Sequence, residues 1–188
     1  MATEAQSPPQ ARYRLFETPL GPCGIAWTEH GVARLQLPEG DRGATERRIK
    51  KTATPGGSAP PHIEQVIADV HWYLSGRSTD FAAVALDLAR VGTFEQKVYA
   101  VVRSVRWGET TSYGEIAREV GVPHAARAVG QALARNPIPI IIPCHRILAK
   151  GHRIGGFSAY GGRLTKERLL ALEGVQLEEA PPLLPGFV

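Results

Sequence analysis

The 188-residue chain is long enough to bury one good core or two small ones. Hydrophobic residues make up 43% of it and charged residues 21%, which excludes a disordered or fibrous protein. No apolar run reaches the roughly 20 residues of a membrane helix, and residues 1–13 lack the apolar stretch of a secretory signal. We therefore expect a cytoplasmic protein with no membrane partner, and the net charge of +4 favours an anionic partner.

The first part of the chain carries three strand-like segments. Residues 1–12 are polar and contain prolines, so we expect them to be flexible. Residues 13–18 and 24–27 are typical of strands and are joined by a Pro-Leu-Gly-Pro turn, and residues 32–37 alternate like a third strand. Together they predict a small sheet.

A loop and a helix are expected to complete this first domain. Residues 40–61 are polar and rich in glycine and proline, which predicts a long loop. Residues 63–74 carry apolar side chains at helical spacing, and Gly76 is placed to end that helix. We find no chemical constellation here and predict a structural domain over residues 1–90.

The second domain, predicted over residues 91–188, opens with a helix. Thr93 followed three residues later by Gln96 makes a capping box for a helix that runs to about Ser104. Its buried stripe is expected to consist of three valines, Val98, Val101 and Val102.

A second capping box introduces a pair of short helices. Residues 112–115, Ser-Tyr-Gly-Glu, start a helix to Val120, and Gly-Val-Pro at 121–123 turns the chain into a helix from His124 to Arg135. This pattern is that of a helix-turn-helix, whose second helix can enter a DNA groove. Packed helix pairs with a glycine turn are also common in proteins that bind no DNA. The fold class predicted is α+β, with a winged-helix-like, mostly helical second domain.

The most reactive residue type follows this helix pair. Asn136 and an apolar run over residues 138–142, interpreted as a buried strand, lead to Pro-Cys-His-Arg at 143–146. A thiol with an imidazole and a guanidinium beside it is suited to a nucleophile, because nearby positive charge or a base favours the thiolate. Adjacent side chains seldom face each other, so His145 would act through a bridging water. The alternative is that Cys144 is a small buried hydrophobe.

These motifs, taken together, resemble the methylated-DNA–protein-cysteine methyltransferase family. The resemblance rests on Tyr113, Ala-Arg-Ala-Val-Gly at 126–130, Asn-Pro at 136–137 and Pro-Cys-His-Arg-Ile at 143–147. It covers Thr93–Glu173 strongly, and the first domain only in length and coarse order. Several short motifs in the right order are far more specific than any one of them.

The resemblance implies repair of 6-O-alkylguanine, and also of 4-O-alkylthymine, in double-stranded DNA. Cys144 would take the alkyl group irreversibly, once per molecule, after the damaged nucleotide is flipped out of the helix. Glu173 would orient His145, which draws the thiol proton through water, and Asn136 would tie the recognition helix to the active-site strand. Without the resemblance, Glu173 would be interpreted as a solvated carboxylate near a helix end.

The resemblance also assigns roles to residues of the helix pair. Tyr113 would donate a proton to the leaving guanine, whereas its alternative is a half-buried aromatic residue at a helix start. Arg127 would enter the duplex and fill the space of the extruded nucleotide, or alternatively contact a phosphate. The residues expected to contact DNA are Ser112, Ala126, Arg127, Gly130 and Arg135.

The substrate pocket is expected to be formed by Tyr113, Ile147, Tyr160 and Gly161. The backbone carbonyls of Cys144 and Ile147 would bind the exocyclic amine of guanine. One departure from the family lies in residues 154–162, a stretch longer than usual. We hypothesise that this loop, through Phe157 or Tyr160, tunes the size of the alkyl group that fits.

No cofactor and no metal are expected. Cys23 and His30 are two potential ligands where a closed zinc site needs four, and Cys23 is better interpreted as a partly buried strand thiol. We expect a monomer.

Three other functions are weighed. A non-catalytic protein that recognises alkylated DNA would lack Cys144, and a transcription factor would need no Pro-Cys-His-Arg motif. A cysteine hydrolase would turn over its substrate.

Overall fold

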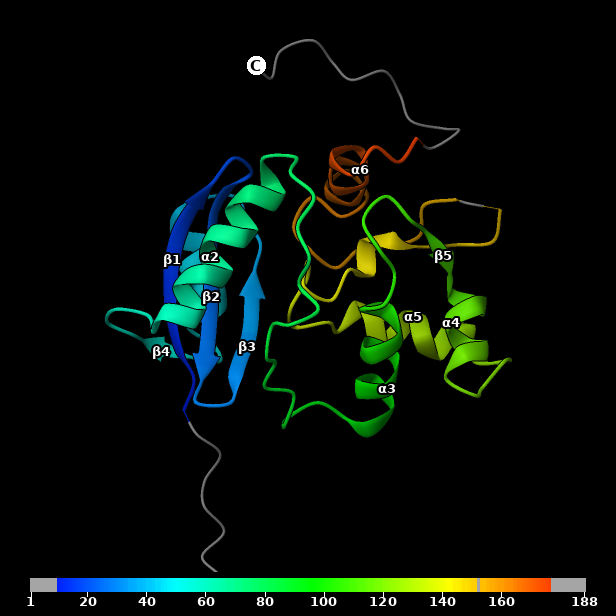
Figure 1. The fold of residues 1–188 in the computed structure, drawn as a ribbon, viewed down its shortest axis with the longest axis horizontal. Helices are drawn as coiled ribbons and strands as arrows, with labels where there is room; N and C mark the ends of the chain where they lie inside the picture. The colour runs from blue at the N-terminus through cyan, green and yellow to red at the C-terminus, as the bar shows by residue number, and fades with distance from the viewer. Residues whose placement is uncertain (1–9, 152, 177–188) are drawn as a thin grey trace, which may run out of the picture. The chain divides into compact units, whose positions relative to one another are not determined.

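The computed structural model describes residues 10–151 and 153–176. The chain divides into two compact units. Unit 1 contains the residues up to Gly92 together with Pro137–Ile141, and unit 2 contains Thr93–Asn136 and the residues from Ile142 onwards. Unit 1 holds a sheet with helices and unit 2 is mostly helical, so the predicted α+β class is confirmed (Figure 1).

Unit 1 is built on a four-stranded sheet in the order β3-β2-β1-β4. The strands are β1 (Arg12–Thr18), β2 (Gly21–Thr28), β3 (Gly31–Gln36) and β4 (Thr54–Pro55). The first three pair antiparallel, and β4 runs parallel to β1. Residues 1–12 were expected to be flexible, and residues 1–9 lie outside the described residues. For residues 10–12 the expectation is wrong, because Arg12 begins β1 and Ala11 O accepts a hydrogen bond from Thr54 N at 2.9 Å.

The long loop predicted for residues 40–61 is wrong, since this stretch contains α1 (Arg42–Ile49) as well as β4. Asp41 caps the helix by accepting a hydrogen bond from Ala44 N at 2.7 Å. Only Thr45 and Ile49 of the helix are buried, so the sequence shows no apolar periodicity here. Contacts of single residues hold this helix on the sheet in place of an apolar stripe. In one of them, Tyr13 Oη donates to Glu46 at 2.8 Å.

The one helix predicted in the first domain, over residues 63–74, is present as α2 (Pro61–Leu74), and it lies against β1. Ile63, Val66, Val70 and Tyr73 are buried at the spacing of one helix face. The helix ends at Leu74 with Ser75 as its C-cap, and Gly76 follows with φ of 80°, which a glycine adopts without strain. No helix among residues 10–151 and 153–176 is long and apolar enough to cross a membrane.

Over its described residues, unit 2 contains five helical elements and two short strands. In chain order these are α3 (Thr93–Val102), β5 (Thr111–Ser112), α4 (Tyr113–Glu119), α5 (Ala126–Ala134), η1 (Cys144–Arg146), β6 (Ile147–Leu148) and α6 (Arg163–Leu172). Strands β5 and β6 pair in parallel, so Thr111 lies opposite Ile147. This pairing joins the start of α4 to the end of the Pro-Cys-His-Arg segment.

The buried stripe predicted for α3 is partly wrong. Val98 and Val102 are fully buried, but the third buried residue is Tyr99, whereas Val101 is partly exposed. Positions 98, 99 and 102 lie on one face at spacings of three and four, and the valine-only stripe overlooked an aromatic residue on that face.

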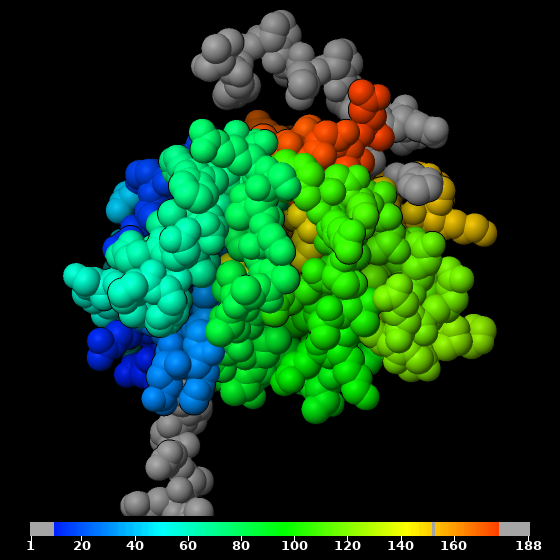
Figure 2. Space-filling model, viewed as in Figure 1, coloured from blue at the N-terminus to red at the C-terminus, as the bar shows by residue number. Residues whose placement is uncertain are grey.

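The predicted helix pair is present as α4 and α5. The Ser112 hydroxyl accepts from Glu115 N at 3.2 Å and Glu115 accepts from Ser112 N at 2.8 Å, which is the predicted capping box. Helix α5 begins at Ala126, two residues later than predicted. The turn between the helices is exposed, and Figure 2 shows it in yellow-green at the surface.

The strand predicted over residues 138–142 is absent. The isoleucines of this run are buried, but its backbone is irregular, and Ile140 has φ of 71°. Pro137, Pro139 and Pro143 cannot donate to a strand ladder, which explains why an apolar run here forms no strand.

Candidate active site

Cys144 is the first residue of η1 and is 6% exposed. The side-chain amide of Asn136 donates to its Sγ at 3.1 Å and to Ile142 O at 2.8 Å. Asn136 directly follows Arg135, the C-cap of α5, so one side chain connects the end of that helix with the thiol. The structure therefore brings Asn136 and Cys144 together, as the resemblance implies.

The environment of Cys144 has opposing effects on its ionisation. Burial raises the pKa of the Cys144 thiol, whereas the Asn136 amide, the Lys166 ammonium and the backbone N–H groups of Cys144 and His145 lower it. Donors around the sulfur stabilise the thiolate once it forms. Because burial has the largest effect, the thiol needs a base to take its proton.

His145 and Glu173 form a buried pair. His145 Nε2 lies 2.8 Å from Glu173 Oε1, and both side chains are 0% exposed. Glu173 is the C-cap of α6 and not the solvated carboxylate of the alternative interpretation. Burial lowers the pKa of His145, Glu173 opposes this effect, and Arg146 and Lys166 add to it. A neutral His145 donates Nε2–H to Glu173, which makes Nδ1 the basic nitrogen.

The guanidinium expected beside the thiol points to Glu173 instead. Arg146 donates from Nε and Nη2 to the Glu173 carboxylate at 2.9–3.1 Å, and from Nη1 to Val105 O at 2.5 Å. Gly108 N also donates to Glu173 at 3.3 Å. Arg146 therefore fixes the carboxylate that holds His145.

Lys166 supplies positive charge near the thiol, and sequence reasoning missed this residue. It is fully buried, donates to Ile147 O at 2.5 Å and lies 5.8 Å from the centroid of the Tyr113 ring. Burial lowers the pKa of Lys166 to about 8. The sequence does carry a signal for its burial. Lys166 lies three and four residues before Leu169 and Leu170, so it shares the apolar stripe of α6 with them.

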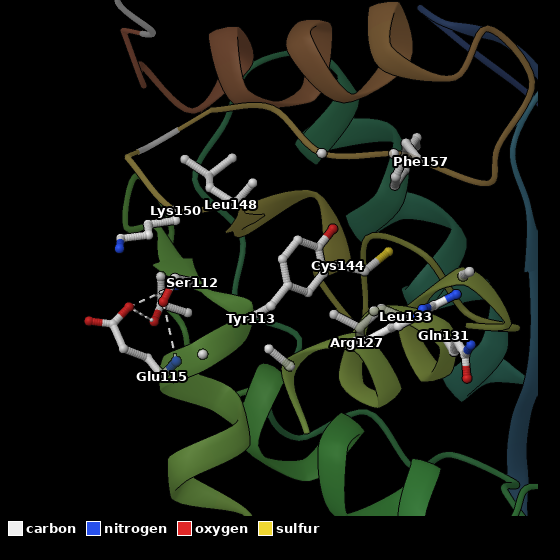
Figure 3. A pocket seen from close by; sticks show the side chains of 18 of the residues that line it. Ser112, Tyr113, Glu115, Arg127, Gln131, Leu133, Cys144, Leu148, Lys150 and Phe157 are labelled. Atoms are coloured by element: carbon white, nitrogen blue, oxygen red, sulfur yellow. Dashed lines mark hydrogen bonds between the residues drawn. The ribbon is translucent and has the colours of Figure 1, made fainter. Parts of the chain in front are cut away.

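Cys144 borders a pocket of about 1160 Å³ that lies within unit 2 (Figure 3). The pocket is lined by α4, by α5, by the segment after β6 and by the loop before α6. Residues that line it include Tyr113, Arg127, Gln131, Leu148, Lys150 and Phe157. Figure 3 shows the Tyr113 ring next to the sulfur of Cys144. An α5 residue, a thiol and a phenol thus face one space.

Tyr113 is half-buried at the start of α4. Burial and the neighbouring Cys144 raise the pKa of Tyr113, so its hydroxyl holds a proton and acts as a donor. The loop before α6 passes close to it, since a Cβ at Gly155 would lie 3.0 Å from the Tyr113 hydroxyl. Only a glycine at 155 leaves this hydroxyl undisturbed.

The other residues expected in the pocket lie elsewhere. Ile147 is fully buried, and its carbonyl accepts from Lys166, while Cys144 O accepts from Ile147 N. Tyr160 is 59% exposed, and Gly161 lies in the turn before α6 with φ of 81°. None of Ile147, Tyr160 and Gly161 lines the pocket. Their contact with substrate stays a prediction.

Four of the five residues expected to contact DNA line this pocket: Ser112, Ala126, Arg127 and Gly130. Arg127 is exposed on α5. Arg135, the fifth, does not line the pocket, and its guanidinium donates to Glu95 at 2.8 Å. The contact residues expected on α5 are thus gathered in its first half.

The two residues weighed as zinc ligands lie in unit 1. Cys23 is fully buried in β2 rather than partly buried, and burial raises the pKa of its thiol to about 12. The His30 side chain is 61% exposed. Among the residues that the structure describes, no three His, Cys, Asp or Glu side chains are grouped so that they could hold a metal ion.

The fold and the site together define a helix-turn-helix protein whose second helix borders a pocket containing a buried thiol. Two family profiles match the chain: "6-O-methylguanine DNA methyltransferase, DNA binding domain" over residues 93–175 and "6-O-methylguanine DNA methyltransferase, ribonuclease-like domain" over residues 11–88. The chain belongs to the 6-O-methylguanine DNA methyltransferase family, also called the methylated-DNA–protein-cysteine methyltransferases. It is therefore a DNA-repair enzyme that transfers alkyl groups, and DNA is its partner.

Curated relatives and solved structures cover nearly the same length. The methylated-DNA–protein-cysteine methyltransferase of Mycobacterium leprae is 40% identical over 167 residues, which cover 87% of this chain and 93% of the relative. The crystal structure of the 6-O-methylguanine methyltransferase of Mycobacterium tuberculosis is similar with a TM-score of 0.72 and 35% identity, over 92% of this chain and 96% of that one. The same organism's OGT in complex with DNA gives a TM-score of 0.71 and 36% identity, over 86% and 92%.

Proposed function

We propose that the protein repairs 6-O-alkylguanine, and also 4-O-alkylthymine, in double-stranded DNA by moving the alkyl group to Sγ of Cys144. The observation that carries this proposal is the buried Cys144 thiol, which opens onto a pocket bordered by α5 and is held by Asn136. Family membership supports DNA as the substrate, and the thiol supports a covalent acceptor. Each molecule acts once.

The damaged nucleotide leaves the base stack to reach the thiol. Cys144 is 6% exposed, and a base stacked in a duplex cannot present its 6-oxygen to a sulfur at that depth. The pocket is large enough for a nucleobase, whose recognition sites are commonly cavities of roughly 300–1,000 Å³. Arg127, exposed on α5 at the pocket, fills the vacated space in the duplex.

The transfer is a displacement at the alkyl carbon. The thiol proton of Cys144 passes through a water to Nδ1 of His145, whose imidazolium is stabilised by Glu173. The thiolate then forms a bond from sulfur to the alkyl carbon, the bond from that carbon to the guanine oxygen breaks, and its electron pair stays on guanine. Asn136 and Lys166 stabilise the thiolate before the attack.

Tyr113 neutralises the departing base. Its hydroxyl holds a proton in the pocket and donates it to guanine as negative charge develops there. His145 then releases its proton to solvent, and Tyr113 regains one from solvent. In the net reaction a proton replaces the alkyl group on guanine, and the Cys144 thiol becomes a thioether. Thiol exchange cannot cleave a thioether, so the transfer is irreversible.

The loop before α6 is proposed to set the size of the alkyl group. Gly155, Gly156, Phe157 and Ser158 all line the pocket, which supports a contact between this loop and the adduct. Shortening the loop should change the ratio of the transfer rates for methyl and benzyl adducts. An unchanged ratio would remove this part of the proposal.

A second function, recognition of alkylated DNA without chemistry, would need no nucleophile in the pocket, and Cys144 argues against it. Specificity for alkylated guanine, a monomeric state, the absence of a membrane partner and a cytoplasmic location stay predictions.

The experiment is intact mass spectrometry after incubation with a short duplex that carries one 6-O-methylguanine. Wild type, Cys144→Ser and Cys23→Ser are compared, the last as a control for the other buried thiol. We expect wild type and Cys23→Ser to gain one methyl group on Cys144 and to stop at one equivalent. A methyl gain by Cys144→Ser, or repair beyond one equivalent, would overturn the acceptor assignment. Lesion binding without any mass gain would favour the recognition protein.

A further inference from the structure

One face of α3 holds the end of α5 at two points. The hydroxyl of Tyr99, which is 1% exposed, donates to Ala132 O at 2.9 Å. One turn earlier on α3, Glu95 accepts from the Arg135 guanidinium at 2.8 Å. Both contacts act on the last turn of α5, at the opposite end of the helix from Arg127.

This last turn leads directly to the residue that contacts the thiol. Ala132 O also accepts from Arg135 N at 3.1 Å, and Asn136 N donates to Leu133 O at 3.2 Å. The Asn136 amide in turn donates to Cys144 Sγ at 3.1 Å. The carbonyl bound by Tyr99 is therefore only one helical turn from the side chain that touches the sulfur.

The Tyr99 hydroxyl is suited to a permanent contact. Burial, followed by Glu95 and Cys144, raises the pKa of Tyr99 to about 12. The phenol therefore keeps its proton and remains a donor to Ala132 O across the range in which DNA is repaired. A ring at position 99 without the hydroxyl would fill the same space but leave the carbonyl without this donor.

We propose that Tyr99 is a positioning residue of alkyl transfer: it fixes the last turn of α5 so that Asn136 stays on the Cys144 thiol while the first half of α5 binds DNA. This inference rests on the proposed function, in which Cys144 is the acceptor. Force on α5 from the duplex would otherwise shift Asn136 together with the helix end. The Glu95–Arg135 pair supports the same turn from the surface.

The experiment compares Tyr99→Phe with Tyr13→Phe. The control loses the hydroxyl of another buried tyrosine, whose part-buried contact to Glu46 at 2.8 Å lies in unit 1 and has no link to Asn136. Three quantities are measured: the single-turnover transfer rate at saturating DNA, the Kd for DNA and the Tm. We expect Tyr99→Phe to slow the saturated rate about fivefold, the effect of one lost buried hydrogen bond, with Kd changed less than about twofold. Tyr13→Phe should leave the rate and Kd unchanged.

A double-mutant cycle with Asn136→Ser tests whether Tyr99 acts through Asn136. If it does, adding Tyr99→Phe to Asn136→Ser slows the reaction no further. Independent, multiplying effects would overturn the proposal, as would a Tyr99→Phe variant that has a lower Tm but the wild-type saturated rate. If Asn136→Ser does not fold, the comparison of Tyr99→Phe with Tyr13→Phe decides alone.

A Cys144→Ser variant separates failure of the acceptor assignment from failure of the positioning role of Tyr99. Cys144→Ser is included in the same series. Methyl transfer to Cys144→Ser would refute the acceptor assignment and the role of Tyr99 with it. An inert Cys144→Ser beside a fully active Tyr99→Phe would refute only the positioning role.

Discussion

The Nε2 atom of His145 lies 2.8 Å from Oε1 of Glu173, and that carboxylate also accepts hydrogen bonds from the guanidinium of Arg146. The buried carboxylate of Glu173 thus binds both His145, which can gain and lose a proton, and Arg146, which is permanently charged. Burial first, and then the Arg146 charge, oppose the effect of Glu173 on the pKa of His145, so the imidazole does not become a fixed cation.

Glu173→Gln should destabilise the protein strongly. The substitution removes the charge that balances the buried Arg146, and an uncompensated buried partner costs about 3–5 kcal/mol. Chemical denaturation measures the free energy of unfolding. Glu167→Gln is the matched control, since its i,i+4 pair with the half-exposed Arg163 contributes at most about 1 kcal/mol. Similar losses in the two variants would contradict a special role for the buried pair.

Lys166→Met should remove a rise in stability at alkaline pH. The pKa of Lys166 is about 8 in the folded protein and 10.5 as a free group, so between these values the unfolded chain binds more protons. Its burial cost is therefore complete below pH 8 and is relieved as pH rises. The free energy of unfolding of wild type relative to Lys166→Met should increase by up to about 3 kcal/mol from pH 8 to 10.5. A flat difference would show that Lys166 is not desolvated.

Gly155→Ala should slow alkyl transfer, because the new methyl would lie 3.0 Å from the Tyr113 hydroxyl and displace it or the loop. A displaced proton donor costs up to about 100-fold in rate. The control Gly57→Ala, in unit 1 and away from the pocket, places its methyl in open space and should keep the wild-type rate. Single-turnover rates at saturating DNA provide the comparison. Equal rates in the two variants would mean that the hydroxyl position does not matter.

Arg127→Ala distinguishes two ways in which this exposed residue could act on DNA. If Arg127 fills the space of the flipped nucleotide, the saturated transfer rate falls by at least about tenfold, while the slope of log K against log salt stays unchanged. If it binds a phosphate, the slope decreases by about 1 and the saturated rate is retained. We expect the first outcome. DNA titrations at several salt concentrations, paired with single-turnover rates, measure both quantities.

Local signals in the sequence were sufficient for part of the fold. The Ser112–Glu115 box predicts the start of α4 because both partners lie within one turn. Helix α1 was missed because a cap at Asp41 and two buried residues produce no periodicity. The strand expected after Pro137 was wrong because apolar character specifies burial, whereas the prolines control the backbone.

The sequence predicts the site residues that belong to a motif, but not how their side chains are directed. The motif places Arg146 beside Cys144 in sequence, but its guanidinium is directed by Val105 and Glu173, which lie 41 and 27 residues away. Lys166 shows the reverse case, since its charge reaches the site from α6 although no motif marks it. The folded chain, and not adjacency, determines which cation affects the thiol.

The grouping of Pro137–Ile141 with unit 1 has a consequence for synthesis on the ribosome. Leu35 N in β3 donates to Pro137 O at 3.0 Å, so a strand made early bonds to a segment made much later. Unit 1 cannot complete its core until residue 141 has left the exit tunnel, by which time α3, α4 and α5 already exist as nascent chain. A fragment cut at residue 92 would lack the three buried isoleucines of this segment, and the released second half would carry them exposed.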